Sequence, residues 1–261
     1  MSGPDGSTTI SDEPVRAGRF DVVHLTDTGT TREQNQDAAW SAAAGDRAVL
    51  VVADGMGGHK GGAAASATAV DIVRAEFERA GEVAPDMTVT FARVSKGVAE
   101  AAPDGGTTLV VALVSSERVE VWHVGDSRAY LYREGSVRRI TSDHSWVQAL
   151  VDKGKLTTEQ AAVHPRRNVL LRAVGKGRDP DPTYSAMRFM PDDLVLLCSD
   201  GLHGVVTDAE IGAILERGDS IETIAQRLVQ AAIDRGAPDN IGIALAAWRT
   251  NETEERQGND E

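Results

Sequence analysis

The sequence predicts an α+β fold built on largely antiparallel sheets. Strand-like segments come in consecutive runs, and helix-like segments fall between the runs rather than after every strand. Strict alternation of single strands and helices is typical of parallel, doubly wound sheets, whereas runs of strands favour antiparallel sheets. The interior also holds no repeat and no linker rich in Pro or Ser, so we expect one domain.

Strand signals dominate the chain. Each is a short apolar or alternating run rich in β-branched and aromatic residues, and turn residues separate the runs. In chain order they cover residues 20–25, 47–53, 107–114, 119–124, 129–133, 183–189, 194–198 and 241–248.

Helix signals are fewer and sharper. Residues 62–80 and 87–101 predict two helices, the first rich in small residues. From Ser220 onward apolar residues recur at helical spacing, and Gly236 stands where a C-terminal cap belongs. Two residue pairs have the spacing of a capping box: Thr157 with Gln160, and Thr207 with Glu210.

Composition bounds the class of protein. The 261 residues carry 27 basic and 40 acidic side chains, a net charge of −13, with a single cysteine. This balance argues against nucleic-acid binding, and no apolar run is long enough to insert into a membrane. We expect residues 1–18 to be disordered, residues 19–249 to form the domain and residues 250–261 to be a disordered acidic tail. We also expect a cytoplasmic, monomeric protein without disulfides.

Aspartates stand at the ends of several predicted strands. Asp54-Gly55 and Asp200-Gly201 each follow a buried apolar strand, Asp126 follows Gly125 in the same way, and Asp239 precedes a strand. Any one of these can be an ordinary turn, since Asp and Gly favour turns. Several carboxylates brought together would repel one another unless a cation neutralised them, and oxygen ligands alone suit Mg²⁺ or Mn²⁺.

Six short motifs, taken in order, resemble those of the type 2C, metal-dependent Ser/Thr protein phosphatases. They are Arg32–Asp37 (REQNQD), Asp54–His59 (DGMGGH), Gly106–Thr108 (GTT), Val124–Arg128 (VGDSR), Ser199–Gly201 (SDG) and Asp239-Asn240. The similarity runs from about residue 26 to residue 248. The methionine in DGMGGH and residues 143–175 resemble the bacterial branch, whose members oppose Hanks-type kinases.

The resemblance implies a fold and an activity. The fold is a sandwich of two antiparallel sheets flanked by helices on both outer faces, with two Mn²⁺ or Mg²⁺ ions at one end. The activity is hydrolysis of phosphoserine and phosphothreonine in proteins, including a Hanks-type kinase and its substrates, by a hydroxide that bridges the metals.

The resemblance also assigns roles to individual residues. Asp54, the Gly55 carbonyl, Asp200 and Asp239 would bind the two metals, and Asp37 would act through water. Arg32 would hold phosphate oxygens with its planar guanidinium. Asp126 resembles the ligand of a third, weaker metal, and Asn168 stands where its partner is often a serine.

Two details and two alternatives stay open. Met56 stands where many relatives have a proton-donating His, so the leaving group would take its proton from water or from His59. A flap over residues 143–172, with His144, Trp146 and Arg166, could touch a phosphoprotein. The alternatives are a catalytically silent phosphoprotein-binding module and a hydrolase of small phosphate esters.

Overall fold

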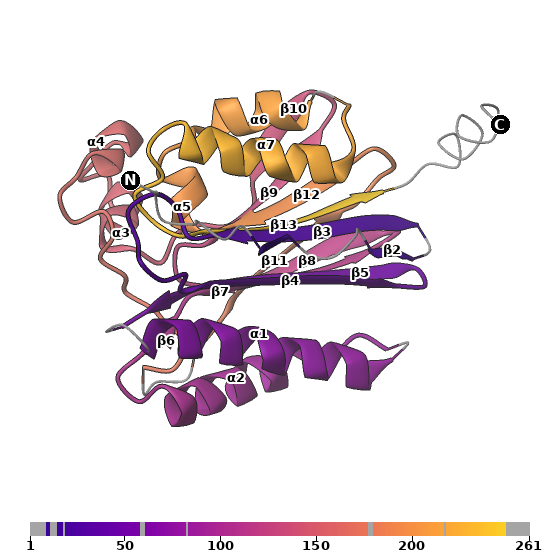
Figure 1. The fold of residues 1–261 in the computed structure, drawn as a ribbon, viewed down its shortest axis with the longest axis horizontal. Coiled ribbons are helices and arrows are strands. Elements are labelled where there is room, and N and C mark those ends of the chain that lie inside the picture. Colours follow the sequence, from indigo (N-terminus) through magenta and orange to yellow (C-terminus); the bar gives the residue numbers. More distant parts are fainter. Residues whose placement is uncertain are drawn as a thin grey trace, which may run out of the picture.

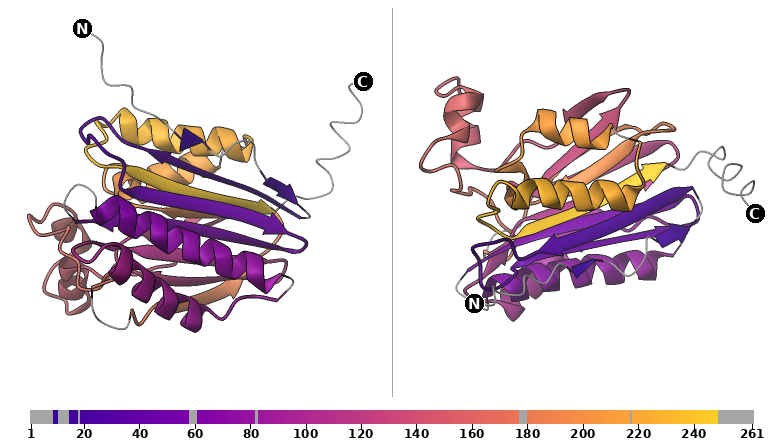
Figure 2. Two further views of the ribbon diagram at one scale, coloured as in Figure 1. Left: turned by 60° about the horizontal axis from the view of Figure 1, so that its bottom comes forward. Right: turned by 45° about the horizontal axis from the view of Figure 1, so that its top comes forward.

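The computed structural model describes residues 9–10, 15–17, 19–57, 61–81, 83–176, 180–216 and 218–248. It forms four layers, helix–sheet–sheet–helix, as Figures 1 and 2 show. The predicted α+β sandwich of two antiparallel sheets is therefore confirmed.

The first sheet is antiparallel throughout, in the order β1-β3-β13-β12-β9-β10, with β2 also pairing with β3. Its strands are β1 (Thr9–Ile10), β2 (Val15–Ala17), β3 (Phe20–Asp27), β9 (Arg128–Arg133), β10 (Ser136–Arg139), β12 (Leu194–Cys198) and β13 (Ile241–Trp248).

The second sheet is also antiparallel, in the order β11-β8-β7-β5-β4, with β6 pairing with the end of β5. Its strands are β4 (Asp37–Ala44), β5 (Arg47–Met56), β6 (Gly106–Thr107), β7 (Leu109–Ser115), β8 (Arg118–Val124) and β11 (Thr183–Arg188).

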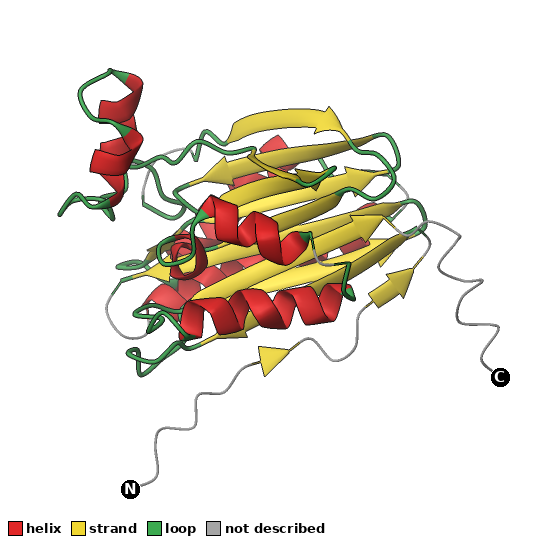
Figure 3. Ribbon diagram, turned by 90° about the horizontal axis from the view of Figure 1, so that it is seen from above, coloured by secondary structure: helices red, strands yellow, loops and turns green. Residues whose placement is uncertain are grey.

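Helices cover the outer face of each sheet (Figure 3). The helices α1 (Gly61–Ala80) and α2 (Met87–Ala101) lie on the second sheet, and α5 (Asp200–His203), α6 (Asp208–Leu215) and α7 (Ile221–Ile233) lie on the first. The short helices α3 (Trp146–Asp152) and α4 (Thr158–Ala162) project from one end. Both predicted capping boxes are present, at the starts of α4 and α6.

The alternation of side chains along β5 shows why its apolar run is continuous. Ala48, Leu50 and Val52 point into the core between the two sheets, whereas Val49, Val51 and Ala53 pack against α1 and α2. Successive side chains of a strand point to opposite faces, so a strand covered on both faces must be apolar at every position. Burial in both directions fixes the register that brings Asp54 to the end of the strand.

Several features differ from the sequence predictions, among them the short elements β10 and α5, which were not predicted. The strand β4 was not predicted, because its Ala-rich sequence has low strand propensity and its pairing with β5 overrides that preference. The helix α3 was also missed. Within residues 1–18, expected to be disordered, β1 and β2 pair with β3, since the edge of a sheet offers unpaired backbone groups. The acidic tail, residues 250–261, lies outside the described residues.

The topology gathers the strand-end aspartates. In antiparallel pairs one strand ends where its neighbour begins, so β5, β8 and β12 end at the same side of the sandwich at which β4 and β13 begin. This side also carries the projecting helices α3 and α4 (Figure 1). Among the described residues, no helix is long and apolar enough to cross a membrane.

Candidate metal and phosphate site

The strand-end aspartates surround one cavity of about 460 Å³. Seven of the nine predicted site residues line it: Arg32, Asp54, Gly55, Asp126, Asn168, Asp200 and Asp239. Asp37 lies beside them and is buried, whereas His59 lies outside the described residues. The structure thus brings residues from 32 to 239 together at one end of the sandwich.

Asp54 is held by its own strand and by the segment before β7. It pairs with Asp37 across β4 and β5, and its amide donates a hydrogen bond to Thr108 Oγ1 at 2.9 Å. Its carbonyl accepts hydrogen bonds from the Thr107 hydroxyl and the Thr108 amide, both at 2.9 Å. The backbone of Asp54 is therefore fixed on both sides before its carboxylate meets any ligand.

Gly55 leaves no room for a side chain. A Cβ at this position would lie 2.1 Å from the Gly62 carbonyl oxygen and 2.6 Å from the Gln36 carbonyl oxygen. The Gly55 amide donates to that Gln36 oxygen at 3.0 Å. Glycine is thus required by close backbone packing, which brings the loop before β4 against the end of β5.

Asp200 and Asp37 are linked through Ser199. The Ser199 hydroxyl donates to Asp37 Oδ2 at 2.6 Å and accepts from the Gly242 amide at 2.9 Å. It therefore ties the end of β12 and the start of β13, in the first sheet, to the start of β4 in the second. The sequence motif contained Ser199 but gave no reason to assign it this role.

Arg32 and Asp239 meet at the mouth of the cavity. An Arg32 guanidinium nitrogen lies 2.8 Å from Asp239 Oδ2. The neighbouring Asn240 is buried and holds both loops, since its Oδ1 accepts from the Gln36 amide and its Nδ2 donates to the Thr28 carbonyl, at 2.9 and 2.8 Å. Asn240 thereby sets the position of the loop that carries Arg32.

Asp126 follows a left-handed glycine. Gly125 has φ +107°, and a Cβ there would lie 2.6 Å from the Thr108 side chain. The Asp126 carbonyl is 3.0 Å from Nε2 of the half-buried His203. Burial lowers the pKa of His203 to about 3, so the ring is neutral and donates from Nε2. His203 was given no role from sequence, and here it fixes the backbone of Asp126.

The carboxyl groups disfavour ionisation in one another's presence. Burial, together with the neighbouring carboxylates, raises the pKa of Asp37 and of Asp126 to about 8 and that of Asp200 to about 6. The same causes, burial first and then Asp37, raise the pKa of Asp54 well above its usual value. Buried like charges behave in this way unless positive charge compensates them.

The donor set fits divalent cations. Among the described residues, Oδ1 of Asp200 is buried without a hydrogen-bond partner, and the surrounding donors are hard carboxylate and carbonyl oxygens. As the side chains lie here, no group of three or more described His, Cys, Asp or Glu residues stands close enough to hold a metal ion. The carboxylates instead line a shared cavity of about 460 Å³, which cations and water can fill.

The flap over residues 143–172 is anchored beside the cavity. Its two ends pair with each other, since the Trp146 amide donates to the Val169 carbonyl and the Leu171 amide to the His144 carbonyl, both at 2.8 Å. Asp143 accepts two hydrogen bonds from Arg128, at 3.0 and 2.7 Å. Asn168, on the paired segment, then lines the cavity.

His144 belongs to the base of the flap rather than to its exposed surface. Its ring stacks on His123 with centroids 4.5 Å apart, and its Nδ1 accepts from the Gly125 amide at 3.2 Å. Burial lowers the pKa of His144 to about 4, which keeps Nδ1 able to accept. Trp146 is half-buried against His164, with ring centroids 5.2 Å apart.

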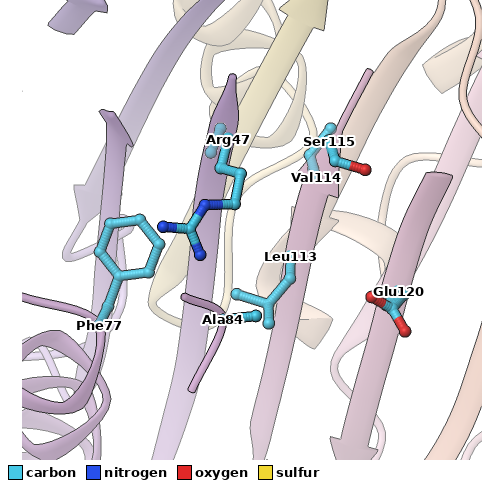
Figure 4. Close-up of a pocket in the computed structure, with 8 residues that line it drawn as sticks. Arg47, Phe77, Ala84, Leu113, Val114, Ser115 and Glu120 are labelled. Atoms are coloured by element: carbon cyan, nitrogen blue, oxygen red, sulfur yellow. The ribbon is translucent and has the colours of Figure 1, made fainter. Parts of the chain in front are cut away.

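A second cavity lies at the opposite end of β5, where Arg47, Phe77 and Leu113 line it (Figure 4). It measures about 40 Å³, which is room for one to a few waters. The Arg47 guanidinium donates to the Gly81 carbonyl and so has a partner already. This cavity is too small to be a substrate site.

Comparison with known proteins agrees with this geometry. The family described as protein phosphatase 2C matches residues 29–241. The serine/threonine protein phosphatase PstP of Mycobacterium tuberculosis is 35% identical over 228 residues, covering 84% of this chain and 43% of the relative. The serine/threonine phosphatase Stp of Listeria innocua is 35% identical over 233 residues, covering 84% of this chain and 92% of the relative. The chain thus spans less than half of the length of the mycobacterial relative.

Solved structures are similar in fold. The serine/threonine phosphatase Stp1 of Staphylococcus aureus superimposes with a TM-score of 0.83 at 32% identity, over 92% of this chain and 99% of that one. The catalytic domain of a serine/threonine protein phosphatase PstP, in complex with two manganese ions, has a TM-score of 0.75 at 31% identity, over 88% and 98%.

Proposed function

This chain belongs to the protein phosphatase 2C family, and on that premise we propose that it hydrolyses phosphoserine and phosphothreonine in proteins with the help of divalent cations. The observation that carries the proposal is the convergence of carboxyl groups from both sheets, four lining one cavity together with Arg32 and a fifth, Asp37, buried beside them. We further propose that the substrates include a Hanks-type kinase and its targets, as the motifs suggest.

We propose a metal-binding role for each of these residues. Asp54, the Gly55 carbonyl, Asp200 and Asp239 would hold two Mn²⁺ or Mg²⁺ ions, and Asp37 would act through water. Asp126 and Asn168, which both line the cavity, would hold a third. When bound, the cations supply Lewis acidity that lowers the pKa of water and screens the charge of the phosphate.

Arg32 would bind the phosphate. Its planar fork can donate to two oxygens at once, and in this structure it donates to the carboxylate of Asp239. The pair is partly exposed, with 52% of the Arg32 side chain accessible, so the guanidinium can exchange a carboxylate for a phosphate at small cost.

The reaction replaces one P–O bond by another. An oxygen derived from water forms the new bond to phosphorus while the bond to the Ser or Thr oxygen breaks. The leaving oxygen needs a proton, and Met56, which lines the cavity, has none to donate. We propose that water in the cavity supplies it, with His59 as the alternative donor.

The test is phosphate release from a phosphothreonine peptide. We expect turnover with Mn²⁺ or Mg²⁺, loss of turnover in EDTA, and near-complete loss in Asp54→Asn. The matched control is Asp71→Asn, which removes a carboxylate from the exposed face of α1 and leaves turnover intact. Peptide binding without turnover under any metal would contradict the proposal and favour the silent binding module. Faster hydrolysis of a sugar phosphate than of the peptide would favour the small-ester hydrolase.

A further inference from the structure

The flap differs in charge from the rest of the protein. Residues 143–172 contain five basic and three acidic side chains, a net charge of +2 on a chain of −13. One of the three acids, Asp143, is already occupied by Arg128 at the base of the flap. Residues 160–178 contain four arginines, one lysine and no acidic residue.

Two of these arginines come directly before a residue that lines the cavity. Arg166 and Arg167 directly precede Asn168, which lines the cavity, and the turn is closed by hydrogen bonds from the Arg167 amide to the His164 carbonyl and from the Val169 amide to the Arg166 carbonyl. Consecutive Cα atoms are about 3.8 Å apart, so both guanidinium groups are within a side chain's reach of the mouth.

Both side chains are exposed and available. Arg167 makes no ion pair with any described residue, and Arg166 lies over the Trp146 ring, 5.5 Å from its centroid. That contact leaves the edge of the guanidinium open to a carboxylate. Arg172 differs, because it reaches Asp181 and the Thr183 hydroxyl, at 3.8 and 3.5 Å.

The rest of the cavity lining has no free cationic side chain for a flanking carboxylate. Among the described residues that line the cavity, Arg32 is the single basic one, and it is reserved for the phosphate, while the aspartates are reserved for the proposed cations. A carboxylate near the phosphoresidue therefore finds free cationic side chains on the flap, which orients the chain across the cavity.

We propose that Arg166 and Arg167 select phosphoprotein segments with acidic side chains within about three residues of the phosphoresidue, a reach set by ~3.5 Å per extended residue. This inference rests on the proposed function and specifies its substrate class. Because exposed charge pairs are individually weak, we expect the two arginines together to give roughly a two- to tenfold preference in kcat/KM for an acidic over a neutral peptide.

The experiment compares two phosphothreonine peptides that differ only in Glu or Gln at the flanking positions. The ratio of kcat/KM, acidic over neutral, is measured for the wild type, for Arg166→Gln/Arg167→Gln and for Arg167→Glu. Lys96→Gln is the control, because it removes a cation that is 79% exposed on α2, away from the cavity. Fluorescence anisotropy of both labelled peptides gives the same ratio for binding, independently of turnover.

We expect the ratio to exceed one in the wild type and in Lys96→Gln, to approach one in the double variant, and to fall below one in Arg167→Glu. At about 0.5 M salt the wild-type ratio falls toward one, because exposed charges are screened. A wild-type ratio of one, or a double variant that keeps the wild-type ratio, overturns the inference. Absence of turnover with every metal refutes the proposed function instead, and the anisotropy ratio still decides the role of the flap.

Discussion

Replacing Arg32 by Ala separates the stability of the fold from the binding of phosphate. Arg32 is a loop residue whose side chain is 52% exposed, and the side chain of its ion-pair partner Asp239 is 32% exposed. The loop itself is held by other groups, since the Gln36 amide donates to Asn240 and the Thr30 amide to the Ala237 carbonyl. Truncation of Arg32 therefore leaves the frame of the site in place.

The two expected magnitudes differ widely. An exposed ion pair contributes about 0–1 kcal/mol to stability. Charge-assisted hydrogen bonds to a phosphate inside the cavity contribute about 1.5–3 kcal/mol to binding, which corresponds to roughly a ten- to 150-fold loss of kcat/KM. Arg32→Lys keeps the charge but loses the planar fork, so we expect a value between those of the wild type and Arg32→Ala.

The assay is steady-state hydrolysis of the phosphothreonine peptide at saturating Mn²⁺, with urea denaturation of the same samples. We expect KM to rise more than kcat falls, and the free energy of unfolding to change by less than about 1 kcal/mol. If Arg32→Ala keeps kcat/KM within about threefold of the wild type, the assignment of Arg32 to phosphate binding is refuted. The loss of even one charge-assisted hydrogen bond would lower kcat/KM by more than that.

Two further predictions concern the metal-free protein and the flap. In EDTA, we expect the free energy of unfolding to fall as pH rises from about 7 to 8.5. The folded protein keeps Asp37 and Asp126 protonated up to a pKa of about 8, whereas the unfolded chain loses these protons near pH 3.8. Equal stability at the two pH values in urea titrations contradicts this. Asp143→Asn removes the two-bond anionic partner of the largely buried Arg128 and leaves only Asp208, at 3.9 Å, so we expect it to destabilise the fold by about 2 kcal/mol. The exposed flap control Asp152→Asn costs less than about 0.5 kcal/mol in the same titration.

The sequence predicts the carboxylates of the site better than the residues that hold them in position. Asp54, Asp126 and Asp200 each end a strand that is apolar enough to identify, and in an antiparallel sheet neighbouring strand ends meet. That strand-end signal, together with the six ordered motifs, is sufficient to predict the α+β sandwich and the set of carboxylates. Each strand end and each motif is recognised from residues close to one another in the chain.

The residues that hold the carboxylates in position are not predictable in the same way. The Ser199 hydroxyl meets Asp37 across 162 positions, and the Asn240 amide meets Gln36 across 204. Nothing near either residue in the sequence names its partner, since Ser and Asn are ordinary at strand ends and turns. The strand β4 was not predicted for a related reason, because its strand conformation depends on pairing with β5 and not on its own alanines. The stacking of His144 on His123, 21 residues away, was not predictable for the same reason.

The carboxylates do not belong to one sheet. Asp37, Asp54 and Asp126 extend from the second sheet, and Asp200 and Asp239 from the first. Cations held among them would link the two sheets of the sandwich at the end that carries the cavity. With the proposed ions bound, affinity for the ion and the spacing of the sheets would be linked, so we expect a substitution in the core between the sheets, such as Leu197→Ala, to weaken ion binding although it touches no ligand. Removal of the ion would in turn loosen packing between the sheets well away from the cavity.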